Sequence, residues 1–158
     1  FPESKKVDLS LKVCPKQNSH GRLEIDVADR FGYRPVRLAF TEEGQLTADS
    51  GADPVEVARY QPGRWYELSL TLDVPAGTYR LSIDGKAVPR EFTFAEHVKS
   101  VERLSLRTGE YRTEPTRATP RDLQPDFTTP NPDEPEPQAT YAVDDVVITP
   151  TAAITAAK

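Results

Sequence analysis

The sequence predicts an all-β fold, a two-sheet antiparallel β-sandwich, on three observations. First, apolar and polar residues alternate along two segments between Tyr60 and Ile83, with turn residues between them, a pattern typical of antiparallel strands with one buried face. Second, Asp84-Gly85 follows at once, and this dipeptide favours a two-residue hairpin. Third, short apolar runs bounded by Gly and Pro recur along the chain, as in sandwiches and barrels.

The N-terminal third of the chain predicts three strands. Every second residue of Val7–Val13 is aliphatic. In Arg22–Ala28, aliphatic residues alternate with Glu24 and Asp26, which we expect to face outward. Val36–Phe40 is a short apolar run after a loop that contains Gly and Pro.

The central strands carry the clearest pattern. Val55–Tyr60 leads through a Gln-Pro-Gly turn into Arg64–Asp73, and a Pro-Ala-Gly turn leads on into Thr78–Asp84. Tyr66 and Tyr79 are in phase with the leucines of their strands, so we expect both rings in the core.

The remaining strands are Glu91–Phe94, Arg103–Thr108 and Tyr141–Ile148. No amphipathic helix is evident, although Phe94–Val101 has room for one helical turn. Because Tyr141–Ile148 carries valine and isoleucine on both faces, we expect it to lie buried inside the sandwich.

Residues 110–140 contain seven prolines, which cannot donate ladder hydrogen bonds. They are either an insertion between the last two strands, pinned to the surface by Leu123 and Phe127, or a linker to another domain. We favour the insertion, because Tyr141–Ile148 has no other partner. The sandwich then spans residues 1–149, and residues 150–158 form a tail or linker.

Composition narrows the classes of partner and location. The net charge is -5 and the pI about 5.1, which argues against nucleic acid because phosphate binding needs a basic surface. No apolar run is long enough to cross a membrane. Cys14 is the one cysteine, expected as a buried structural thiol, and the count excludes a Cys/His zinc site. The chain has no Met, so we expect a processed product or a fragment. Loss of a signal peptide is one such processing step, and it would fit a protein that is secreted, periplasmic or on the cell surface.

Three stretches in order carry a resemblance to a known family: PGRWYELSLTLDVPAGTYRLSIDGKAV, then VERLSLRTG, then YAVDDVVI. They resemble laminin G-like, concanavalin A-like jelly-roll domains, over roughly Val55 to Ile148. The resemblance implies an accessory module of secreted multidomain proteins, frequently sialidases, other glycoside hydrolases or polysaccharide lyases. Fold by itself does not give function.

A first candidate site is the run Glu24-Ile25-Asp26-Val27-Ala28-Asp29. It resembles the catalytic strand of retaining endo-glucanases of the laminarinase family, which implies Glu24 as nucleophile, Asp26 as its tuner and Asp29 as acid/base. Such hydrolysis needs two carboxyls about 5 Å apart, and this spacing would need a bulge to bring both to one face. An amphipathic strand without catalysis explains the same residues.

A second candidate site is aromatic. Sugar-binding modules stack aromatic faces on pyranose rings, and Trp65, Tyr33 and Phe31 are the candidates for glycan binding. Trp65 lies out of phase with the core residues of its strand, and the other two lie in a Gly-containing loop. Packing at the rim or in the loop is the alternative for each.

A third candidate site is Asp144-Asp145 in the closing strand. Similar modules often hold a structural Ca²⁺ near such a pair, and calcium takes six to eight oxygen ligands. The alternative is an ion pair with an arginine or a capped turn. No other cofactor is expected.

The leading hypothesis is a non-catalytic module of a larger secreted carbohydrate-active protein, which binds glycan or buttresses the catalytic domain. Its partners would be carbohydrate or other domains of the same parent protein, without nucleic acid or membrane insertion. The alternatives are a protein-interaction or adhesion module of a surface protein, and a small retaining glycoside hydrolase that uses Glu24 and Asp29.

Overall fold

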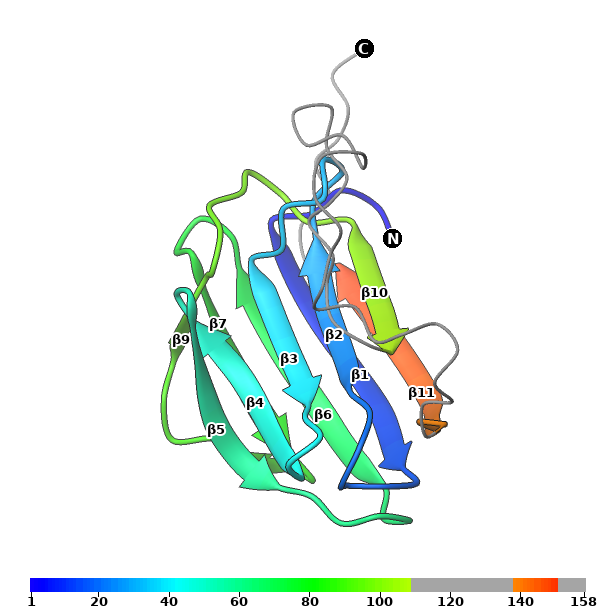
Figure 1. Ribbon diagram of the computed structural model, residues 1–158. Helices are drawn as coiled ribbons and strands as arrows, with labels where there is room; N and C mark the ends of the chain where they lie inside the picture. The colour runs from blue at the N-terminus through cyan, green and yellow to red at the C-terminus, as the bar shows by residue number, and fades with distance from the viewer. Residues whose placement is uncertain (109–137, 151–158) are drawn as a thin grey trace, which may run out of the picture.

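The computed structural model describes residues 1–108 and 138–150. Within these ranges the chain forms eleven β-strands and no helix, and the strands pair antiparallel in two stacked sheets (Figure 1). The predicted two-sheet antiparallel β-sandwich is therefore confirmed. The strands are β1 (Lys6–Pro15), β2 (Leu23–Ala28), β3 (Val36–Phe40), β4 (Gln45–Ser50), β5 (Asp53–Arg59), β6 (Tyr66–Asp73), β7 (Thr78–Ile83), β8 (Lys86–Ala87), β9 (Phe92–Thr93), β10 (Arg103–Thr108) and β11 (Tyr141–Pro150).

The six-stranded sheet has the order β11-β1-β6-β7-β8, and β9 also pairs with β7. The five-stranded sheet has the order β10-β2-β3-β4-β5. One face of each sheet is apolar, and these two faces meet to form the core, as expected when sheets pack face to face. Tyr66 and Tyr79 both lie in this core, as predicted, and Cys14 is a buried free thiol.

The turns follow from their residues. Asp84 and Gly85 have φ values of 51° and 74°, the left-handed conformation that a type I′ hairpin requires at both central positions. This turn joins β7 to β8, so the predicted hairpin is confirmed.

Two short strands were not predicted, and the helical turn for which Phe94–Val101 has room is not formed. β4 and β8 have no strong alternation of their own, and each is formed through pairing with its neighbours. The connection from Phe94 to Val101 is irregular and contains no helical turn.

The prediction that Tyr141–Ile148 lies buried inside the sandwich was wrong. β11 is an edge strand that pairs only with β1 among the described strands, and Val146 and Val147 are 45% and 55% exposed. The register shifts opposite Ser10–Lys12, where Asp145 has a positive φ of 49°. Two residues of β11 face one residue of β1 there, which is a β-bulge.

Other predictions concern residues outside the described ranges: most of the Pro-rich stretch 110–140 with Leu123 and Phe127, and the tail after Pro150. What the structure does place is β11, which pairs with β1 from Pro15↔Tyr141 to Val7↔Pro150. None of the described residues forms a helix long and apolar enough to cross a membrane.

Candidate functional site

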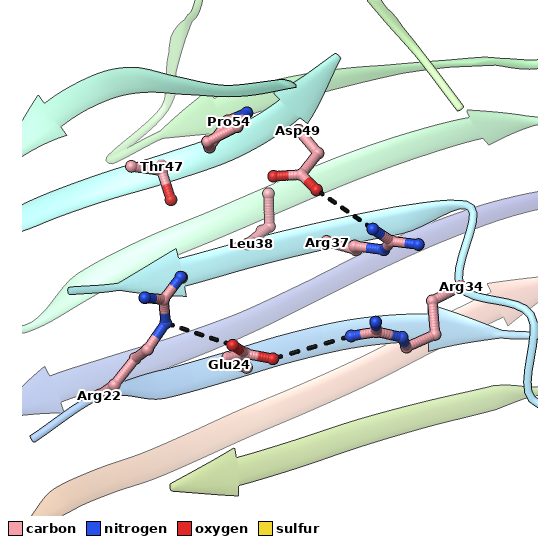
Figure 2. Close-up of a pocket in the computed structure, with 9 residues that line it drawn as sticks. Arg22, Glu24, Arg34, Arg37, Leu38, Thr47, Asp49 and Pro54 are labelled. Atoms are coloured by element: carbon pink, nitrogen blue, oxygen red, sulfur yellow. Dashed lines mark ion pairs between the residues drawn. The ribbon is translucent and has the colours of Figure 1, made fainter. Parts of the chain in front are cut away.

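The outer face of the five-stranded sheet contains a hollow of about 270 Å³. Ala39 on β3 and Thr47 on β4 are cross-strand partners in its lining, and both side chains are short. Longer charged side chains, Arg22, Glu24, Arg34, Arg37 and Asp49, also line it (Figure 2). We call it the outer-face hollow. It is lined by Arg22, Glu24, Arg34, Arg37, Leu38, Ala39, Thr47, Asp49 and Pro54.

Glu24 of β2 organises one wall of the outer-face hollow. Its carboxylate oxygens lie 3.2 Å from Arg22 Nε and 3.7 Å from Arg34 Nη1. Arg107 of β10, the direct cross-strand partner of Glu24, donates to the same carboxylate. Three guanidinium groups therefore hold the Glu24 side chain in a fixed orientation. This side chain is 13% exposed.

Asp26 lies two residues further along the same face of β2. It was expected to face solvent, and it does point away from the core, but Arg34 and Arg107 cover it so that it is only 1% exposed. Its carboxylate accepts from Arg107 Nη2 at 3.0 Å and from Arg34 Nη1 at 3.4 Å. A buried carboxylate is tolerated only when paired in this way.

Asp49 and Arg37 form the opposite wall. Arg37 Nη2 is 3.2 Å from a carboxylate oxygen of Glu96, whose other oxygen accepts from the backbone N–H of Arg34. Arg37 Nη1 is 3.8 Å from Asp49 Oδ2, beyond hydrogen-bond distance. Burial raises the pKa of the Asp49 carboxyl, although the charges of Arg37 and Arg34 oppose this shift.

Each of the three carboxylates proposed for hydrolysis has structural partners, and Glu24 and Asp26 share Arg34 and Arg107. The register of β2 with both neighbours is continuous, so the bulge that the hypothesis requires is not present. Asp29 lies beyond the strand, where its Oδ1 accepts from the backbone N–H groups of Phe31 and Tyr33 at 2.8 and 2.9 Å. This oxygen shapes the β2–β3 loop, and the geometry gives the hydrolase hypothesis no support.

The predicted aromatic residues do not come together. Phe31 and Tyr33, 78% and 55% exposed, lie in the β2–β3 loop, whereas Trp65, 44% exposed, lies just before β6. These two loops are at opposite ends of the sandwich (Figure 1). A single aromatic platform of the three is therefore not formed, although Tyr33 directly precedes Arg34 of the outer-face hollow.

Asp144 and Asp145 are both exposed on the edge strand β11. Asp145 pairs with Lys12 Nζ at 2.6 Å, while an oxygen of Asp144 accepts from the Asp145 N–H. Within residues 1–108 and 138–150, no group of three or more Asp, Glu, His or Cys side chains is gathered for a metal ion. The calcium site stays a prediction from sequence.

Sequence reasoning missed Arg22, Arg34, Arg37, Asp49 and Arg107 as site residues. A signal was present, because charged residues stand at every second position of β2 and recur in the strands that pair with it. Only the pairing register shows that they converge.

A second hollow, of about 790 Å³, lies where β10 and β11 form the same edge of the sandwich. Its lining includes Leu104, Leu106 and Ile148, and Leu106 is 39% exposed. We call it the edge hollow. Its lining also includes five charged residues: Asp26, Arg34, Glu102, Arg103 and Arg107.

Comparisons with known proteins place the chain. The model of a family described as "Sialidase-like, CBM domain" matches residues 1–123. A solved structure of a sialidase is 31% identical with a TM-score of 0.83, and the match covers 96% of this chain and 14% of that chain. The chain thus spans about a seventh of the length of that sialidase. A search of the curated proteins found no match.

Two further solved structures share the fold at lower identity. Ligand-free congerin I is 13% identical with a TM-score of 0.55, and the match covers 94% of this chain and 95% of that chain. Sheep galectin-11 in complex with glycerol is 15% identical with a TM-score of 0.52, over 68% of this chain and 86% of that chain. At these identities the likeness shows the fold alone.

Proposed function

The chain belongs to the family of sialidase-like carbohydrate-binding modules, and from this premise we propose that it is a non-catalytic glycan-binding accessory module of a larger, secreted carbohydrate-active protein. We assign the binding to the outer-face hollow. A parent protein in the periplasm or on the cell surface is equally compatible with this role. An adhesion module that binds protein remains the alternative reading of the same sandwich.

The observation that carries this proposal is the fixed polar lining of the outer-face hollow. Sugars present many hydroxyl groups, each of which donates and accepts hydrogen bonds. Arg22, Arg37 and Asp49 offer donors and acceptors in the same lining as the short side chains of Ala39 and Thr47. Ion pairs already hold these side chains in place, so little conformational entropy is lost when a ligand binds.

The size of the outer-face hollow limits the ligand. Its volume of about 270 Å³ lies just under the range of roughly 300–1,000 Å³ that is usual for pockets of drug-sized ligands. One sugar ring fits such a space, and an extended oligosaccharide does not. We infer that the module recognises one ring, with neighbouring rings outside the hollow.

The experiment is affinity electrophoresis of the 158-residue chain against soluble polysaccharides and glycoproteins, followed by titration calorimetry on any that retard it. Arg37→Ala is expected to weaken binding about tenfold or more, because a hydrogen bond from a charged group contributes about 1.5–3 kcal/mol. Arg80→Ala is the matched control, since Arg80 is an exposed arginine, ion-paired with Glu91, on the other sheet. Equal affinities for the two variants would remove the outer-face hollow as the site.

The edge hollow favours a second function, contact with another part of the parent protein. Leu106 is 39% exposed there, beside the half-buried Leu104 and Ile148 and five charged residues of the lining, and exposed apolar side chains rimmed by polar residues often mark interfaces. Leu106→Asp would then weaken association of the chain with the separately expressed remainder of its parent. Unchanged association in calorimetry would argue against this contact.

A further inference from the structure

We propose that the outer-face hollow selects an uncharged sugar ring with free hydroxyl groups and rejects sugars that carry a carboxylate. This inference rests on the glycan-binding function proposed above and names the ligand class of that same site. It is carried by the ion pairs of the lining and by the position of Asp49.

Each arginine that lines the outer-face hollow is ion-paired with a carboxylate of the protein, although Arg22 Nε and Arg37 Nε have no hydrogen-bond partner among the described residues. Arg22 lies 3.2 Å from Glu24, and Arg37 lies 3.2 Å from Glu96. Arg34 contacts both Glu24 and Asp26. A ligand carboxylate that binds one of these guanidinium groups in a bidentate pair would compete with its internal partner, and that partner would lose part of its compensation.

The lining of the hollow has three arginines and two carboxylates, but the ion-paired network to which they belong has a small excess of carboxylates. Among the residues that the structure describes, four arginines in and beside the hollow face five carboxylates. Carboxylates in excess repel an approaching anion, and like-charge contacts of this kind are a common source of selectivity. The arginines are Arg22, Arg34, Arg37 and Arg107, and the carboxylates are Glu24, Asp26, Glu42, Asp49 and Glu96.

Asp49 is the carboxylate of this network that we expect to accept a hydrogen bond from a ligand. Its side chain is only 15% exposed, and its one ion pair, with Arg37, spans 3.8 Å. No described residue donates a hydrogen bond to its carboxylate, whereas Glu24, Asp26 and Glu96 each accept at least one. Burial of this charge without a close donor is consistent with its raised pKa.

A hydroxyl oxygen to one side of the Arg37–Asp49 pair can bridge the two groups. The separation of 3.8 Å between Arg37 Nη1 and Asp49 Oδ2 is too short for an atom on the line between them, but an oxygen off that line can lie about 2.8–2.9 Å from both, which is a normal hydrogen-bond length. The hydroxyl would accept from the guanidinium and donate to the carboxylate. A ligand carboxylate can do the first but has no proton for the second.

The test is calorimetric titration of the chain with one mucin-type glycoprotein before and after enzymatic removal of its sialic acids, and with soluble neutral polysaccharides. We expect the neutral forms to bind at least tenfold more tightly than the sialylated form. Asp49→Asn, which keeps the size of the side chain, should weaken neutral binding about tenfold and reduce the discrimination, because it removes the charged acceptor and its repulsion.

Asp8→Asn is the control, since Asp8 is an exposed carboxylate on the outer face of the six-stranded sheet, where it accepts from Thr71. Thermal melts of both variants show whether each is folded. Tighter binding of the sialylated form, or neutral binding that Asp49→Asn leaves unchanged, would overturn the inference and leave the proposed function in place. Absence of binding to every probe would overturn the proposed function and this inference with it.

Discussion

Asp26→Asn tests whether the ion pairs beside the outer-face hollow hold the fold as well as the site. The substitution keeps the shape of the side chain and removes a charge that is 1% exposed and bonded to Arg107 at 3.0 Å and to Arg34 at 3.4 Å. Loss of one member of a buried ion pair costs about 3–5 kcal/mol.

The expected cost here is lower than that range. The side chains of Arg34 and Arg107 are 14% and 25% exposed, and both keep Glu24 as a partner, so solvent and a remaining carboxylate compensate them in part. We expect a loss of about 2–3 kcal/mol, which for a chain of this length lowers the Tm by about 5–10 °C.

Scanning calorimetry and urea denaturation measure both quantities. Asp8→Asn is again the control, with an expected change within about 0.5 kcal/mol because its position is exposed. A Tm for Asp26→Asn within 1 °C of that of the parent chain would refute the view that this buried pair contributes to stability.

Further measurements address single side chains. Tyr33→Ala should weaken glycan binding severalfold, seen by calorimetry, without a change in Tm, because the ring is 55% exposed; loss of the fold would make it a packing residue. Tyr79→Phe should cost about 1–2 kcal/mol in urea unfolding, because its hydroxyl donates to the Asp49 carbonyl in the core; no change would mean that water replaces this bond. Burial raises the pKa of Asp49 in the folded state above its unfolded value, so the charged form of this side chain opposes folding. The stability of Asp49→Asn relative to the parent chain should therefore increase as the pH rises from about 3.5 to 7. Thermal melts at both pH values check the sign, and the opposite trend would mean that the charge stabilises the fold. Chelator should leave the Tm unchanged, because Asp145 is paired with Lys12; a fall would reveal a calcium ion that stabilises the fold.

The fold was largely readable from the sequence because its signals are local. The alternation of apolar and polar residues places Tyr66 and Tyr79 in the core, whichever strands lie beside theirs. Asp84-Gly85 favours its hairpin turn through its own backbone preferences. β4 was missed because its sequence QLTADS contains few apolar residues, and its strand conformation depends on β3 and β5. β11 was misplaced because valines on both faces do not distinguish a central strand from an exposed edge.

The outer-face hollow was not readable because it depends on the register between distant strands. Arg107 and Glu24 are 83 residues apart in sequence and direct neighbours across the sheet. Ala39 and Thr47 carry no signal singly and come together in the lining as cross-strand partners. By contrast, the exposed aromatic residues were predicted as a binding site from the sequence, but the fold places Phe31 and Tyr33 at the opposite end of the sandwich from Trp65.

The bulge in β11 has a consequence for self-association. An edge strand offers unpaired backbone groups to other chains, and a long regular edge with exposed valines invites polymerisation. At Asp145 the positive φ interrupts the regular spacing of these groups, and the ion pair with Lys12 places charge beside Val146 and Val147. A second copy could add to either half of the strand but could not align along its whole length, so this edge is a poor template for fibrous aggregation.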